Sequence, residues 1–116
     1  MFYKECQKYH FNLLLTICVG LALLFTSCAG DPKKHIARGE ELLTKRKFQE
    51  AVMEFRAAAD IDKSSAEAHW GLARAREGQG DVFETINELR QAIDLKSDHL
   101  DAKTKLGNYL LLVDPP

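Results

Sequence analysis

The sequence predicts an all-α protein, in which five helices form about two and a half helical hairpins after an N-terminal leader. Three observations support this prediction. Segment 66–99 resembles segment 32–65 position by position, apolar side chains recur at spacings of three and four, and helix-start signals fall at matching places. No stretch shows the strict alternation of apolar and polar residues that indicates a strand.

Composition limits the chain to one small domain with an ordinary surface. The 116 residues hold 16 Lys or Arg and 17 Asp or Glu, and nearly all of these follow residue 30. Positive and negative charges are interspersed there, whereas nucleic-acid binding favours clustered basic residues. We therefore expect no nucleic-acid partner and no electrostatic attraction to anionic lipid.

The N-terminus reads as an export signal. Lys4 and Lys8 precede an apolar run at 11–25, and the small residues Thr26 and Ser27 follow it. A spanning helix needs about 20 apolar residues, so the run is short for a permanent anchor. The pattern predicts a secretory signal peptide over residues 1–27.

The residues Phe25-Thr26-Ser27-Cys28 resemble the bacterial lipoprotein signal, or lipobox, although Phe25 stands where Leu is usual. The resemblance implies that Cys28 is lipidated through its sulfur and becomes the new N-terminus, with residues 28–31 as a short linker. An uncleaved signal anchor and a buried N-terminal helix are the alternatives. After cleavage at Cys28 no other cysteine would remain, because Cys6 and Cys18 lie in the leader, so we expect neither a disulfide nor a catalytic thiol.

The rest of the chain is a repeat. The first copy spans 32–65, the second spans 66–99, and a partial third copy spans 100–116. Several residues recur in register between the first two copies: His35 and His69, Glu50 and Glu84, Glu54 and Glu88, Arg56 and Arg90, Ala58 and Ala92, and Asp60 and Asp94.

These copies resemble the tetratricopeptide (TPR) repeat, a helix–turn–helix unit of about 34 residues. The residues at the family's signature positions include Gly39, Leu42, Phe48, Ala51, Phe55 and Ala58, then Leu72, Ala73, Ile86, Leu89 and Ala92, then Leu106, Gly107 and Leu110. The sequence departs from the pattern at Thr85, where Ala is usual, at Lys63 and Ser97, where Pro is usual, and at Trp70, which stands one residue late.

Helix-start signals place each element. Asp31 precedes a proline, which predicts an N-cap followed by proline at the first helical position. Ser64 and Asp81 are each followed three residues later by Glu, the pattern of a capping box. We expect helices near 32–45, 48–61, 65–78, 82–95 and 99–112.

The TPR resemblance implies a groove that is lined by the first helix of each repeat and receives a peptide or a helix. The positions carried over are Lys33, Ile36, Glu40, Leu43, Glu67, Trp70, Arg74, Glu77, Asp101, Thr104, Asn108 and Leu111. Trp70 is the first residue to probe, since Trp is enriched at binding hot spots. The alternative is that Trp70 only packs between adjacent first helices.

The last expected helix is more apolar than the end of a repeat array usually is. Its side chains predict a docking face for a partner or for a second copy of the chain, which would make a homodimer through this helix. This face comprises Leu106, Tyr109, Leu110, Leu112 and Val113.

No constellation of residues suggests an enzyme. The chain has no glycine-rich phosphate loop, no His-Glu-x-x-His and no nucleophile elbow. His35 and His69 occupy equivalent positions, but two histidines alone make a weak metal site, so we expect no cofactor.

Together these features predict a lipid-anchored scaffold for a protein or peptide partner in the bacterial cell envelope. The resemblance to repeat lipoproteins implies a role in assembling pilus, secretion, outer-membrane or polysaccharide-export machinery. We expect the outer membrane, facing the periplasm, if the cell has two membranes. Two alternatives stay open: the N-terminal part of a longer TPR lipoprotein without independent function, and an accessory ligand-binding subunit of an envelope enzyme.

Overall fold

The computed structural model describes residues 30–113, which form a TPR-like solenoid of helical hairpins. The helices are α2 (Pro32–Thr44), α3 (Phe48–Ile61), α4 (Ala66–Gln79), α5 (Val82–Leu95) and α6 (Leu100–Val113). Over this range the predicted all-α class and five helices are confirmed, and each bound lies within one residue of its expectation. The predicted signal peptide and Cys28 lie outside the described residues.

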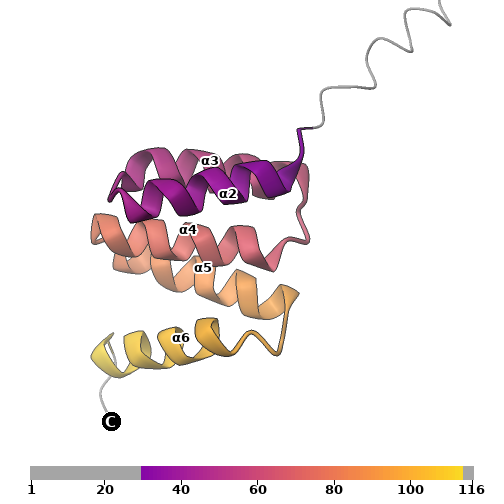
Figure 1. Ribbon diagram of the computed structural model, residues 1–116. Helices are drawn as coiled ribbons and strands as arrows, with labels where there is room; N and C mark the ends of the chain where they lie inside the picture. The colour runs from indigo at the N-terminus through magenta and orange to yellow at the C-terminus, as the bar shows by residue number, and fades with distance from the viewer. Residues whose placement is uncertain (1–29, 114–116) are drawn as a thin grey trace, which may run out of the picture.

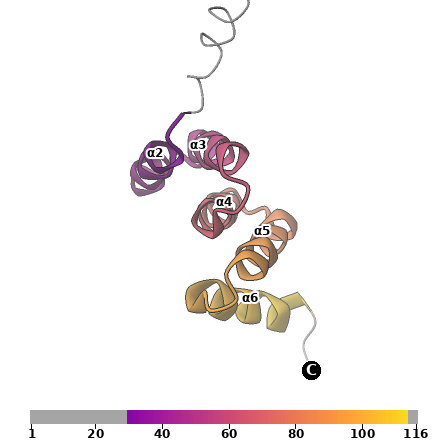
Figure 2. The ribbon, with the colours of Figure 1, turned by 90° about the vertical axis from the view of Figure 1, so that its right-hand side faces the viewer.

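Successive helices run antiparallel and pack against one another, and α2 also contacts α4 (Figure 1). Figure 2 looks along α2 to α5: α2 and α4 lie on one side of the stack, and α3 and α5 lie on the other. In this view α6 runs obliquely beneath α4 and α5 and begins on the side of α2 and α4. The first helix of each repeat therefore contributes to one common face.

The first hydrophobic core forms around Phe55, whose side chain is fully buried between two glycines. A β-carbon on Gly39 of α2 would lie 2.6 Å from the ring, and one on Gly71 of α4 would lie 2.3 Å from it. The two first helices can approach the Phe55 ring on α3 this closely only because both positions lack a side chain. The ring thereby locks the first hairpin to the second.

The second core joins the second hairpin to α6. It comprises the buried residues Ala73, Leu89, Ala92 and Ala102. Thr85 is also fully buried at a position where the TPR pattern usually has alanine. Its hydroxyl donates to the carbonyl oxygen of Asp81 at 2.7 Å, so the extra polar group is satisfied within its own helix.

Side-chain caps open the helices at the period of the repeat. Asp31 accepts from the backbone N–H of Lys33, and Asp81 accepts from that of Glu84, which confirms both predicted caps. The predicted cap at Ser64 is wrong. Ser65 is the N-cap of α4 and accepts from Ala68, because Ser64 is held by the Asp62 carboxylate.

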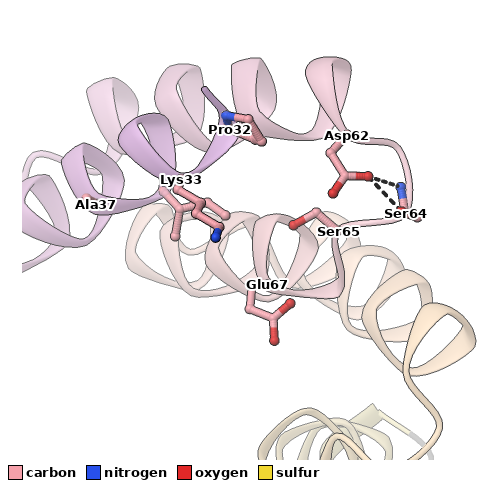
Figure 3. A pocket seen from close by; sticks show the side chains of 8 residues that line it. Pro32, Lys33, Ala37, Asp62, Ser64, Ser65 and Glu67 are labelled. Carbon is pink, nitrogen blue, oxygen red and sulfur yellow. Dashed lines mark hydrogen bonds between the residues drawn. The ribbon is translucent and has the colours of Figure 1, made fainter. Parts of the chain in front are cut away.

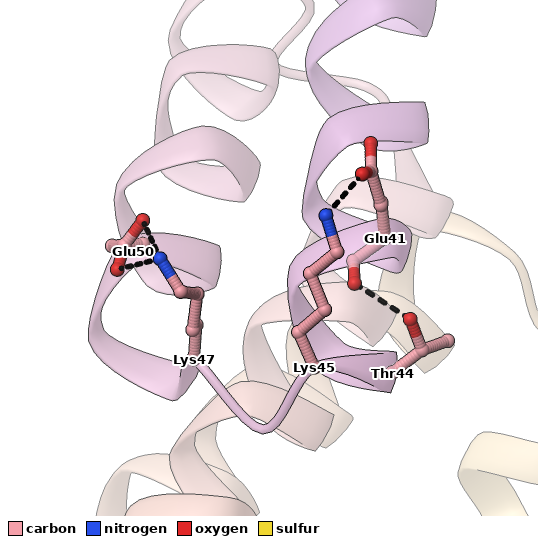
Figure 4. Close-up of polar contacts among 5 residues, drawn as sticks. All are labelled: Glu41, Thr44, Lys45, Lys47 and Glu50. Atoms are coloured by element: carbon pink, nitrogen blue, oxygen red, sulfur yellow. Dashed lines mark hydrogen bonds and ion pairs between the residues drawn. The ribbon is translucent and has the colours of Figure 1, made fainter.

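Equivalent positions also turn the chain between the helices of each hairpin. Arg46 has φ 59°, and Gly80, at the same position of the next repeat, has φ 77°. Glycine adopts this left-handed conformation freely, whereas a residue with a side chain is strained there. Ion pairs of Lys45 with Glu41 and of Lys47 with Glu50 flank the first turn (Figure 4).

Within residues 30–113 no helix is both long enough and apolar enough to cross a bilayer.

Candidate protein-binding groove

A cavity of about 500 Å³ opens where the starts of α2 and α4 meet the loop after α3. Three of the predicted groove residues line it: Lys33, Ile36 and Glu67. Figure 3 shows Lys33 on one side of it, Asp62 and Ser65 on the opposite side, and the Glu67 side chain pointing outward from α4. Its lining is mainly apolar with charged groups at the edge, as in sites that bind an extended or helical segment.

A second cavity, of about 300 Å³, lies further along the same face between α4 and α6. Trp70, Asp101, Thr104 and Asn108 line it, all of which belong to the predicted groove, and Lys105 completes the lining. The structure thus brings predicted groove residues of all three repeats to one face, in two separate hollows.

Two predicted groove residues contribute to packing. Ile36 and Leu43 are only partly exposed and pack against the core around Phe55. Apolar side chains at the edge of a small domain gain more from the core than from water, which sequence spacing alone does not reveal. Leu111, by contrast, is exposed at the far end of α6.

An ion pair joins α2 to α4. Nη1 of Arg74 donates to both carboxylate oxygens of Glu40, at 2.7 and 2.8 Å. The two residues are 34 positions apart in the sequence, so the pair joins equivalent sites of adjacent repeats. Both side chains are about a third or more exposed, which limits the contribution of the pair to stability to about 1 kcal/mol or less.

Trp70 is both a packing residue and a wall of the second hollow. It lies against the core that contains Ala73 and Leu89, and its ring stacks at a tilt on His99, with the centroids 5.2 Å apart. The guanidinium of Arg74 lies 5.9 Å from the centre of the indole, within cation–π range. Packing holds the indole at a fixed angle and leaves its outer part facing the hollow.

Contacts that sequence reasoning missed fix the far side of this hollow. Glu77 accepts from Nζ of Lys105 at 2.7 Å and from the hydroxyl of Tyr109 at 3.0 Å. Burial, together with the Glu77 carboxylate, raises the pKa of the Tyr109 phenol. His99 was missed as well: its Nδ1 accepts from the backbone N–H of Ala102 at the start of α6. The period offered a signal, because His99 occupies the same position of its repeat as the capping Ser65.

The two repeated histidines are paired with carboxylates rather than with one another. Nδ1 of His35 lies 2.7 Å from Oε2 of Glu54, and Nδ1 of His69 lies 2.7 Å from Oε2 of Glu88. Each pair joins the first and second helices of one hairpin. In the part of the chain that the structure describes, no group of three His, Cys, Asp or Glu side chains is placed to hold a metal ion.

The structure places two residues of the predicted docking face on the inner side of α6. Leu106 and Tyr109 point inward and pack against the second core, because they occupy the side of α6 that faces the preceding hairpin. Leu110, Leu112 and Val113 remain exposed, and so does Leu100 at the start of the helix.

Comparison with known proteins gives a partial likeness. No protein-family profile matches the sequence. DnaJ homolog subfamily C member 3 from Bos taurus and the protein of the same name from Rattus norvegicus are each 30% identical to the chain over 81 residues. The matched segment is 70% of this chain but only 16% of each relative's length.

The fold and this similarity define the class of the protein. The described residues form a stack of TPR-like helical hairpins, and this chain spans only a small part of the relatives it matches.

Proposed function

We propose that this protein is a lipid-anchored scaffold that holds a polypeptide partner close to the surface of a bacterial envelope membrane. The observation that carries the proposal is the alignment of two hollows along the face made by α2, α4 and α6, each lined by residues from adjacent repeats. A segment of a partner that lies along this face would contact apolar floors and charged rims in succession.

The rim charges favour a partner that carries both signs. Asp101 offers a carboxylate, and Lys33 offers an ammonium group near the start of the face. The Glu67 carboxylate lies 3.6 Å from Nζ of Lys96 and is partly neutralised by it. Arg74 is already neutralised by Glu40 and Lys105 by Glu77, which lowers the attraction of the middle of the face for a purely acidic segment. Shape and apolar contact at Trp70 then account for most of the affinity.

The proposed tether explains where the partner would be. Cys28 is separated from α2 by three residues, which span about 10–15 Å when extended. The hollow beside Lys33 is lined by Pro32 and Lys33, which stand at the start of α2. A protein anchored through Cys28 would therefore hold a ligand of this hollow next to the lipid headgroups.

Replacement of the lipobox cysteine tests the tether. We expect that Cys28→Ser abolishes acylation and prevents release of the leader, so that its intact mass is that of the unmodified 116-residue chain. Cys6→Ser is the matched control, because Cys6 lies in the leader outside the lipobox, and this variant should fractionate and mature like the wild type. If the wild-type protein retains its leader and an unmodified Cys28 sulfur, the proposed lipid anchor is wrong. The proposal of a binding groove does not depend on this result.

Replacement of Trp70 tests the groove. Full-length Trp70→Ala, recovered from membranes after chemical crosslinking, should lose a stoichiometric partner that the wild type retains. Phe83→Ala serves as the control, since Phe83 is 72% exposed on α5, away from the groove. Equal partner recovery with both variants would exclude the groove as the binding face.

That this chain is one part of a longer repeat protein stays a prediction. The observation that favours it is that the matched segment is only 16% of the length of each of the two relatives. A partner retained by the 116-residue chain alone would argue against it. Assignment to pilus, secretion, outer-membrane or polysaccharide-export assembly is part of the same proposal, as are the outer membrane and its periplasmic side.

A further inference from the structure

None of residues 30–113 covers the side of α6 that faces away from α5, and the two complete hairpins show what covers the equivalent side of α2 and α4. We call three positions of α6 the outer face. By the period of the repeat, they correspond to residues that contact the second helix of the hairpin in the earlier repeats. Lys103 corresponds to His35 and His69, Gly107 to Gly39 and Ala73, and Leu110 to Leu42 and Arg76.

In both complete hairpins an acidic residue and a large apolar residue arrive at this place side by side. Glu54 pairs with His35 while the adjacent Phe55 ring rests on Gly39. Glu88 pairs with His69 while the adjacent Leu89 shares a buried cluster with Ala73. The covering helix therefore offers a carboxylate and a bulky apolar side chain in succession.

Small residues flank this pair at spacings of three. Ala51 and Ala58 flank it in α3, and Thr85 and Ala92 flank it in α5; all four are fully buried. The small side chains let the two helix axes approach closely enough for the bulky residue to contact the small residue of the first helix, Gly39 or Ala73. The pattern is small–x–x–acid–bulky–x–x–small.

On α6 the equivalent space beside Gly107 is not filled by any described residue. A β-carbon built on Gly107 would meet nothing within 4 Å, whereas one on Gly39 would collide with Phe55. Lys103 is exposed where the histidines are half-buried, and Leu110 is 41% exposed. The ammonium group of Lys103 supplies the same charge complement to a carboxylate that a protonated histidine would supply.

We infer that the outer face of α6 binds an amphipathic helix of a partner protein, with an acidic residue opposite Lys103 and an aromatic residue seated on Gly107. This inference rests on the proposed scaffold role and names the class of partner. Charge disfavours a second copy of α6 as occupant. Within residues 100–113 the acidic side chain is Asp101, which lines the groove instead, so Lys103 would stay unpaired.

The chain supplies its own probe. A peptide of residues 47–62 contains Glu54 and Phe55 with their flanking alanines. We expect it to bind the full chain in lipid nanodiscs, as measured by fluorescence anisotropy with empty nanodiscs subtracted. Gly107→Ala should bind the peptide more weakly, because a β-carbon at the equivalent Gly39 would lie 2.6 Å from the Phe55 ring. Gly107→Leu should bind it at least about tenfold more weakly, because its larger side chain fills the space that the ring would occupy.

Charge reversal separates this site from others. Lys103→Glu should weaken binding of the peptide about tenfold, and a Glu54→Lys version of the peptide should restore it. Thr104→Glu, on the groove side of α6, should leave peptide binding unchanged, so failure of the groove proposal and failure of this one give different results. The positions changed are exposed, and circular dichroism checks that each variant folds.

Two results would overturn the inference. The first is an equal affinity of the peptide for wild type, Gly107→Leu and Lys103→Glu, or no binding at all. The second is that the wild type forms a dimer and Gly107→Leu is a monomer, which would show that the outer face binds a second copy of this chain.

Discussion

The ring of Phe55 stands where a side chain of Gly71 would begin: a β-carbon on Gly71 would lie 2.3 Å from Cδ1 of the ring. This contact joins the second helix of one repeat to the first helix of the next. It explains how so short a stack buries a large aromatic residue completely, since the ring is covered by two hairpins rather than by one.

Substitution of Gly71 should therefore destabilise the stack. We expect Gly71→Ala to lower the free energy of unfolding by about 1–3 kcal/mol, because the added methyl group overpacks the crossing. Gly107→Ala is the matched control: its methyl group meets nothing, and alanine favours a helix by about 0.5–1 kcal/mol. Urea unfolding followed by circular dichroism measures both, and a neutral Gly71→Ala would contradict the packing described.

The two hairpin turns make a second matched pair. Arg46 has a left-handed backbone at φ 59° and is exposed, so Arg46→Gly should raise the free energy of unfolding by up to about 1 kcal/mol. Gly80→Ala should lower it by about 1 kcal/mol, because Gly80 has φ 77°. Thermal unfolding of the two variants gives shifts of opposite sign if the turns are as described, and shifts of the same sign if they are not.

Adjacent serines test the correction at the start of α4. Ser65→Ala should lower the free energy of unfolding by about 1 kcal/mol, because its hydroxyl accepts from the N–H of Ala68. Ser64→Ala should change it by less than about 0.5 kcal/mol, since Ser64 bonds an exposed carboxylate outside the helix. The reverse order would restore Ser64 as the cap.

Tyr109 should titrate later than an ordinary phenol. Burial and the carboxylate of Glu77 raise its pKa in the folded protein, so the neutral phenol is favoured there. The stability that this provides is complete below the unfolded pKa of about 10 and is lost as pH rises through the folded value. The absorbance difference between wild type and Tyr109→Phe isolates this phenol from Tyr3 and Tyr9. A midpoint at or below the ordinary value would contradict the contact with Glu77.

Much of the fold could be predicted from the sequence because its period is strict. The constant offset between the copies places equivalent residues in equivalent surroundings, so all five helices can be located from it. Asp31 and Asp81 are not equivalent positions, and their own local signals identify them as caps. Ser64 was misassigned because two adjacent serines can both cap a helix. Only the packing shows that Asp62 holds one of them.

The groove was less predictable, because a position on a helix does not decide what its side chain contacts. Ile36 and Leu43 occupy groove positions but turn toward the core, and Leu106 and Tyr109 occupy an apolar helix but face inward. The contacts of Glu77 with Lys105 and Tyr109 join residues 28 and 32 positions apart, which no local pattern signals.

Site-specific photocrosslinking in the cells that make the protein tests the scaffold most directly. A photoreactive phenylalanine analogue at Thr104, in the hollow beside Trp70, should yield one discrete adduct in the membrane fraction, and the adduct should disappear from that fraction with Cys28→Ser. The same analogue at Phe83 should yield none. No adduct at Thr104, or identical adducts at both positions, would contradict the claim that this face holds a partner at the membrane.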